Sequence, residues 1–114
     1  MGEVMSYQHS ELAAGRWLQM SLLEQMSNIG SEVDRALNWK VKNNIPFSEK
    51  AVDRALELLD LSLDSTRDFP RLKEFARTRE LLVDYFYGAN EHQSSEISWR
   101  KYFLHFNLAL RRDH

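Results

Sequence analysis

Residues 21–43 carry the clearest pattern in the chain, an apolar residue at every third or fourth position. The residues at this spacing are Leu22, Met26, Ile29, Val33, Ala36 and Leu37. It places them on one side of an α-helix, which has about 3.6 residues per turn. Ser21 and Glu24 stand just ahead of the pattern at the spacing of a capping box. The segment is therefore expected to be a long amphipathic helix.

Gly30 borders the apolar stripe of this helix. A glycine inside a helix costs about 1 kcal/mol of helix propensity relative to alanine. We expect the bare backbone at Gly30 to allow another helix to pack closely against it. Pro46 is expected to end the segment, because proline restricts the residue before it to extended conformations.

Three further helices follow from the same reasoning. Ser48 is the expected N-cap of a second helix, with a stripe made by Val52, Ala55, Leu56, Leu59 and Leu63. Pro70 suits the first turn of a third helix, whose buried face is expected to hold Leu72, Phe75, Ala76, Leu82, Val83 and Phe86. Ser94 or Ser95 is expected to cap the last helix, which buries Trp99, Tyr102, Phe103, Phe106 and Leu110.

The chain is thus expected to be all-α, an antiparallel four-helix bundle with a short additional N-terminal helix or extended arm. Its 114 residues include only 4 Gly and 2 Pro, too few for the many turns of an all-β domain. Residues 1–114 are expected to form a single domain, with a flexible N-terminus over 1–10. Residues 10–20 are the expected short helix, with Trp17 covering one end of the core.

Composition narrows the function classes. The chain has no cysteine, which excludes disulfides, thiolate metal sites and thiol catalysis. No apolar run is long enough to span a bilayer, and no secretory signal is recognisable at the N-terminus, so a cytoplasmic location without membrane contact is expected. The net charge of −2 and pI near 6.1 do not indicate a general nucleic-acid binder.

Arg79 is the most informative single residue, because it falls within the expected apolar stripe of the third helix. A buried arginine needs a partner. Glu57 and Asp60 lie on one side of the second helix and are the expected partners, forming a buried polar cluster with Arg79. The alternative is that Arg79 holds a small anionic ligand in a polar pocket. No metal is expected, since Glu57 and Asp60 form only one element of the paired motifs that metal-binding bundles use.

Arg100 and His105 form a second candidate pair, with four residues between them. This spacing resembles the signature of the HEPN superfamily, small helical-bundle domains that include dimeric ribonucleases. The resemblance implies that His105 would act as general acid/base and Arg100 would stabilise phosphate charge. The two residues lie about 140° apart around one straight helix, so a shared site needs a bend or a dimer partner.

Three stretches resemble a family of small prokaryotic helical proteins of unknown function. They are residues 28–36, residues 54–61 and residues 71–86, which read NIGSEVDRA, RALELLDL and RLKEFARTRELLVDYF. The resemblance implies a free-standing, single-domain cytoplasmic protein and brings no activity with it.

No complete catalytic constellation is found. There is no Gly-rich phosphate loop and no Gly-x-Ser-x-Gly elbow. We therefore expect a non-enzymatic helical domain without a cofactor that acts by association, as a homodimer or with a protein partner. The alternative is a HEPN-like ribonuclease or toxin-type RNA-directed enzyme that uses Arg100 and His105.

Overall fold

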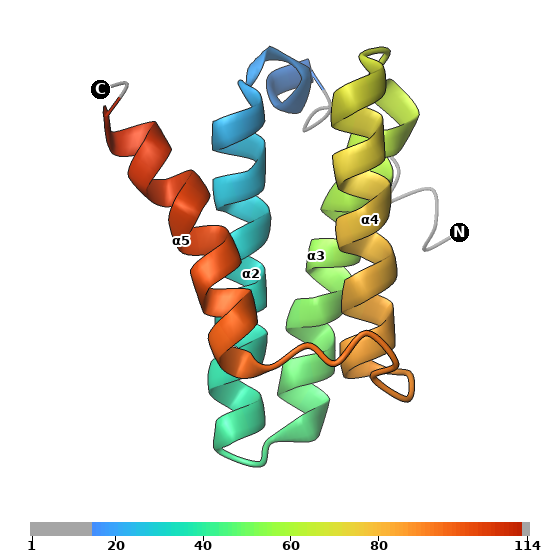
Figure 1. Cartoon of the computed structure of the whole chain (residues 1–114), viewed down its shortest axis with the longest axis vertical. Coiled ribbons are helices and arrows are strands. Elements are labelled where there is room, and N and C mark those ends of the chain that lie inside the picture. Colours follow the sequence, from blue (N-terminus) through green and yellow to red (C-terminus); the bar gives the residue numbers. More distant parts are fainter. Residues whose placement is uncertain (1–14, 113–114) are drawn as a thin grey trace.

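Four long helices make up most of the described part of the chain, residues 15–112, in the computed structural model (Figure 1). They are α2 (Leu22–Val41), α3 (Ile45–Ser65), α4 (Phe69–Phe86) and α5 (Glu96–Arg112). Residues 15–19 are also helical, and no strand occurs among the described residues. The all-α prediction is confirmed. The expected flexible segment, residues 1–10, lies outside the described residues, as do residues 11–14 of the expected short helix.

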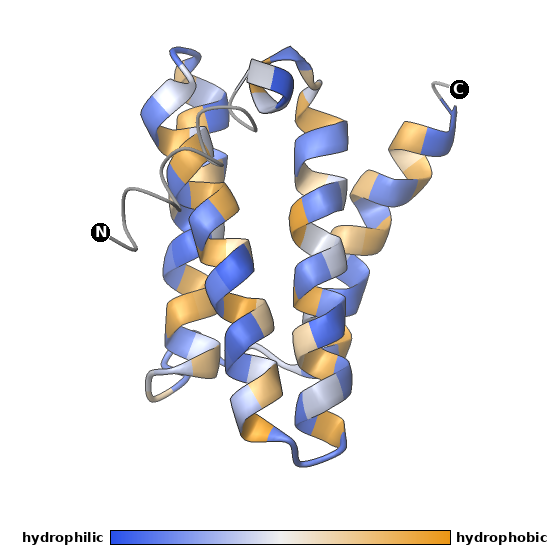
Figure 2. Cartoon of the chain, turned by 180° about the vertical axis from the view of Figure 1, so that it is seen from behind, coloured by the Kyte–Doolittle hydropathy of each residue, from blue (hydrophilic) through white to orange (hydrophobic). Residues whose placement is uncertain are grey.

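Successive helices run in opposite directions along the long axis of the molecule (Figure 1). The closely packed pairs among the described helices are α2 with α3, α2 with α5, and α3 with α4. The pair α4 and α5 is not among them, and α5 leans away from α2 toward its C-terminal end (Figure 1). Hydrophobic and hydrophilic residues are interspersed along every helix (Figure 2). The buried residues of each helix recur mainly every three or four positions, which places them on one side. None of the described helices is long and apolar enough to cross a membrane.

Helix α2 begins as its sequence predicts. The Ser21 side chain accepts a hydrogen bond from the Glu24 amide at 3.1 Å, and the Glu24 carboxylate accepts one from the Ser21 amide at 3.0 Å. This capping box satisfies two amides that the helix itself leaves free. Near the middle of α2, Phe103 of α5 lies directly against Gly30. The close approach expected at this glycine is therefore confirmed.

The start of α3 differs from the prediction. Asn44 is the N-cap, with its side chain accepting from the Phe47 amide at 3.2 Å, and Pro46 lies in the first turn. The expected cap, Ser48, is instead buried inside the helix, where its hydroxyl donates to the Ala36 carbonyl at 2.8 Å. The prediction was wrong because Pro46 can open a helix as well as close one, since its missing N–H is not needed in the first turn.

The helix phase of α4 also differs from the prediction. Its fully buried side chains are Phe75, Thr78 and Leu82, while Ala76 is exposed. The buried face of α4 therefore includes Thr78. The sequence pattern instead predicts that Arg79, the next residue, lies on that face. One step along a helix is about 100° of rotation, enough to move Arg79 from the core to its edge.

One end of the core is covered by Trp17, which is 5% exposed and comes from the helical segment 15–19. Its indole Nε1 donates to the Ser62 hydroxyl at 2.8 Å, and the Gln25 side-chain amide donates to its backbone carbonyl at 2.9 Å. These bonds attach the N-terminal segment to both α2 and α3.

Candidate functional site

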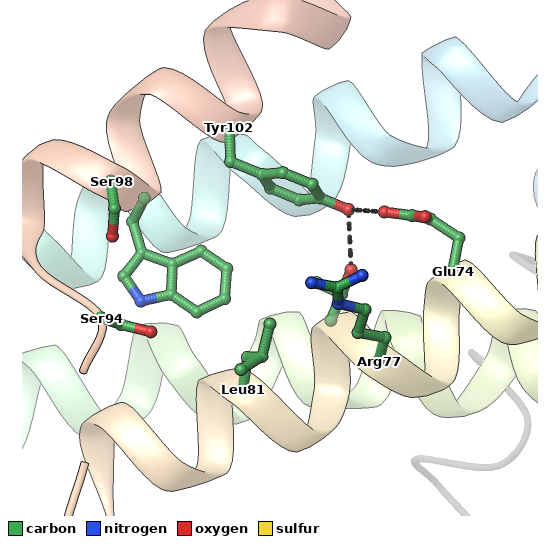
Figure 3. Close-up of a pocket in the computed structure, with 8 residues that line it drawn as sticks. Glu74, Arg77, Leu81, Ser94, Ser98 and Tyr102 are labelled. Carbon is green, nitrogen blue, oxygen red and sulfur yellow. Dashed lines mark hydrogen bonds between the residues drawn. The ribbon is translucent and has the colours of Figure 1, made fainter. Parts of the chain in front are cut away.

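A pocket of about 300 Å³ lies between α4 and α5, where the two helices are not closely packed. We call it the α4–α5 pocket (Figure 3). A volume of this size is at the lower end of those that hold small-molecule ligands. The pocket combines polar and apolar side chains, and its lining is Glu74, Arg77, Thr78, Leu81, Ser94, Ser98, Trp99 and Tyr102.

One wall of the pocket is a chain of hydrogen bonds from α4 to α5. The Tyr102 hydroxyl donates to a Glu74 carboxylate oxygen, and it lies 2.9 Å from the Thr78 hydroxyl (Figure 3). Burial and the Glu74 carboxylate both raise the pKa of Tyr102 above its usual value, so the phenol stays protonated and keeps its hydrogen to donate. The bonded chain fixes the spacing between the two helices at this point.

Arg77 stands at the rim of the pocket, one turn after Glu74 on the same face of α4. Its side chain is exposed. Within residues 15–112 its guanidinium makes neither an ion pair nor a hydrogen bond. Its charge nevertheless reaches the pocket wall, because it opposes the rise in the pKa of Tyr102. The rim therefore has a cation that is available to a ligand.

Trp99 forms the buried side of the pocket and is only 4% exposed. Its ring stacks on Phe103, with centroids 5.9 Å apart and an interplanar angle of 18°. Its indole Nε1 is buried and has no hydrogen-bond partner among the described residues. A buried donor left without an acceptor costs about 1–3 kcal/mol. Such a donor beside a pocket is a reason to look for a ligand there.

The end of the pocket nearest the α4–α5 connection is held by Asp84. Its two carboxylate oxygens accept hydrogen bonds from the backbone amides of Glu91 at 2.7 Å and His92 at 3.0 Å. These bonds lower the pKa of Asp84 below its usual value, because they favour the charged form. The Asn90 side chain then exchanges two hydrogen bonds of 2.9 Å with the backbone of Ser94, which places Ser94 at the pocket.

Ser98, the second serine in the lining, belongs to the cap of α5. Ser95 and Ser98 each accept a hydrogen bond from the other's backbone amide, at 3.0 and 2.9 Å. Ser95 is therefore the N-terminal cap, one of the two residues expected from the sequence. The reciprocal pair starts α5 at Glu96 and holds Ser98 at the pocket rim.

Arg79, predicted from the sequence as the centre of a buried polar cluster, lies on the surface side of α4. Its side chain is 39% exposed, so the expectation of burial is wrong. The guanidinium Nε donates to the Asp60 carboxylate at 2.6 Å, and Asp60 is 52% exposed. Glu57 is exposed on α3 and is not bonded to Arg79 in the described structure. The three residues form a surface ion pair and a neighbouring carboxylate, with no enclosed cavity.

Arg100 is occupied by contacts that join α5 to α2. Its guanidinium donates to the Asn38 side chain at 2.9 Å, to Glu96 at 2.9 Å and to Asp34 at 3.4 Å. Burial raises the pKa of Asp34, and the charge of Arg100 opposes that shift. Each of the three guanidinium nitrogens of Arg100 therefore already donates to a protein oxygen.

His105 lies on the outer surface of α5. Its side chain is exposed and shares a shallow depression with Leu108, Arg111 and Arg112. Arg100 does not line that depression. In a single copy the structure does not bring the two residues of the HEPN-like pair into one site.

Among residues 15–112, no three His, Asp or Glu side chains are arranged so that they could hold a metal ion. Sequence reasoning missed the α4–α5 pocket. The one available signal was the pair Glu74 and Arg77, which have opposite charges at a spacing that puts both on one face of a helix.

Comparison of the chain with models of protein families, with curated proteins and with solved structures finds no match. The resemblances to HEPN domains and to small prokaryotic helical proteins therefore stay predictions.

Proposed function

We propose that this chain is a non-enzymatic, cytoplasmic, ligand-binding domain, an antiparallel four-helix bundle with a short N-terminal helix that is open between α4 and α5. The ligand is a small organic molecule held in the α4–α5 pocket. The observation that carries the proposal is a pocket lined by Trp99, whose buried indole N–H has no acceptor in the described structure. A binding pocket typically combines an apolar wall with a few polar groups, and this one does.

The experiment is a fragment screen by heteronuclear NMR on the full chain, with the three indole N–H resonances assigned. Binding in the pocket is expected to shift the Trp99 indole signal and leave those of Trp17 and Trp39 unchanged. A Leu81→Trp variant fills the pocket and is expected to abolish binding. Leu104→Trp is the matched control, because Leu104 is 49% exposed on the outside of α5. If no fragment shifts the Trp99 signal, or if both variants bind equally well, the proposal is wrong.

A second candidate function is self-association through the outer face of α5, which corresponds to the homodimer expected from the sequence. Ile97, Leu104 and Leu108 are 66%, 49% and 47% exposed. Together with Lys101 they follow a spacing of four, three and four residues, the seam that pairs helices in coiled coils. The occupant of this face would be α5 of a second copy, related by a two-fold axis.

Sedimentation equilibrium separates this candidate from a monomeric binder. The native chain is expected to dimerise, and Leu104→Glu is expected to shift it to monomer. Phe69→Glu is the control, since Phe69 is 73% exposed but lies at the start of α4. A native chain that stays monomeric at millimolar concentration would exclude the dimer.

A further inference from the structure

The α4–α5 pocket has one carboxylate and one guanidinium at its polar rim, and no ion pair joins them. Glu74 and Arg77 both extend from α4 toward Tyr102 (Figure 3). One turn of helix separates them, which normally allows a salt bridge. Other pairs at this spacing in the chain do form one, as Arg35 does with Glu32 at 2.9 Å. The two opposite charges thus stand apart at the same opening.

Each of the two groups has bonding capacity left over. Among residues 15–112, only one of the Glu74 carboxylate oxygens receives a hydrogen bond, from Tyr102. The guanidinium of Arg77 has five N–H donors, and within the described residues it uses none of them. A ligand at this rim can therefore donate to Glu74 and accept from Arg77 without displacing a bond that already exists.

The interior of the pocket has the opposite character. Leu81, the ring of Trp99 and the ring of Tyr102 provide an apolar surface between the two helices. The Trp99 and Tyr102 rings lie edge to face, with their centroids 6.1 Å apart. The apolar angle between the two rings suits a flat or branched apolar group. The Nε1 of Trp99 is buried beside this surface and has no partner among the described residues.

We propose that the ligand of the α4–α5 pocket is a zwitterionic α-amino acid with an apolar or aromatic side chain. Its carboxylate binds Arg77, its ammonium group binds Glu74, and its side chain lies against Leu81 and Trp99. This inference rests on the proposed ligand-binding function and specifies the chemical class of the ligand. A ligand with a carboxylate alone would leave its charge beside Glu74, and a ligand with an amine alone would leave its charge beside Arg77. Only a molecule with both charges complements the rim.

The test compares four probes that share a phenyl group, measured by titration calorimetry against the full chain. L-phenylalanine has both charges, hydrocinnamate only the carboxylate, phenethylamine only the ammonium group, and phenylethanol neither. Phenylalanine is expected to bind best. Removal of either charge is expected to weaken binding about tenfold, which is the typical effect of one charge-assisted hydrogen bond.

Two variants assign each charge to its residue. Arg77→Gln is expected to weaken the binding of phenylalanine about tenfold and not to weaken the binding of phenethylamine, whose charge no longer lies beside a cation. Glu74→Gln is expected to weaken the binding of phenylalanine about tenfold and not to weaken the binding of hydrocinnamate. The side-chain amide oxygen of this variant can still accept the hydrogen bond from Tyr102. Arg67→Gln is the control, because Arg67 is exposed on the α3–α4 connection outside the pocket. Thermal unfolding of each variant checks that it is folded.

The outcomes separate this inference from the proposed function. If all four probes shift the Trp99 indole signal with equal affinity, the pocket binds organic ligands but the zwitterion proposal is wrong. If the charges matter but Arg67→Gln has the same effect as Arg77→Gln, the effect is general electrostatics and the proposal is also wrong. If neither the four probes nor any fragment binds, the ligand-binding function itself fails.

Discussion

A side chain added at Gly30 would collide with Phe103. A Cβ atom built at Gly30 lies 2.7 Å from Cδ1 and 2.8 Å from Cγ of the phenyl ring. Phe103 is 1% exposed, so its ring has little room to move. This contact sets how closely α5 approaches α2, and it explains why a residue of poor helix propensity stands in the middle of α2.

The first prediction follows from this contact. Gly30→Ala is expected to lower the free energy of unfolding by about 1–3 kcal/mol, because overpacking a filled core outweighs the gain in helix propensity. Gly15→Ala is the matched control, since a Cβ at Gly15 meets nothing within 4 Å. Urea unfolding of both variants checks this. Equal stability of the two variants would mean that the α2–α5 contact adapts without cost.

The sequence predicts α2 well because its start and its phase are determined locally. The capping box at Ser21 and Glu24 and a single apolar stripe leave one consistent helix. The phase of α4 could not be predicted in this way. Ala76 and Val83 favour a face that includes Arg79, whereas Phe75 and Leu82 favour a face that includes Thr78.

Tertiary contacts decide between the two faces of α4. The Thr78 hydroxyl finds a partner in Tyr102, whereas a guanidinium in its place would be buried near the aromatic core. The α4–α5 pocket is unpredictable for the same kind of reason. It exists because α5 packs closely on α2 and less closely on α4, and the periodicity of α5 alone does not contain that choice.

The second prediction concerns pH and Asp84. Its pKa is lowered in the folded chain, so it contributes stability that is present above the unfolded pKa and is lost as the pH falls through the folded pKa. Native protein is expected to melt at a higher temperature than Asp84→Asn at about pH 6, and the difference is expected to vanish as the pH falls through the folded pKa of Asp84.

Differential scanning calorimetry across this range measures the effect. Asp64→Asn is a suitable control, because Asp64 is exposed on α3 and makes no bond in the described structure. The amide protons of Glu91 and His92 should shift over the same pH range, since both donate to Asp84. A melting difference that does not depend on pH would show that the charge of Asp84 does not hold the loop.

The third prediction separates the two residues of the HEPN-like pair. Arg100→Gln is expected to lower stability by about 0.5–1.5 kcal/mol, because its contacts to Asp34 and Asn38 join α5 to α2. His105→Ala is expected to change stability by less than about 0.5 kcal/mol, since His105 is exposed. Chemical denaturation measures both.

Incubation with RNA completes this comparison. With Arg100 committed to protein oxygens, native protein and His105→Ala are expected to leave RNA equally intact over the same time course. Cleavage by the native chain that His105→Ala abolishes would instead support the ribonuclease alternative.

The last prediction concerns Trp17 and Ser62, which attach the N-terminal segment to α3. Ser62→Ala removes the acceptor of the buried Trp17 indole N–H. The expected loss is about 1–3 kcal/mol, the typical cost of leaving a buried donor unsatisfied. Ser65→Ala is the matched control, because within the described part of the chain the Ser65 hydroxyl bonds only to the Leu61 carbonyl of its own helix. Its removal is expected to cost less than about 0.5 kcal/mol.

A double-mutant cycle shows whether the loss at Ser62 acts through the indole. In a Trp17→Phe background there is no N–H to leave unsatisfied, so Ser62→Ala should cost clearly less than it does in the native chain. The same cost in both backgrounds would assign the effect to the Ser62 bond with the Leu58 carbonyl at 2.8 Å. In that case Trp17 would stabilise the fold by the burial of its ring, and its polar atom would contribute nothing measurable.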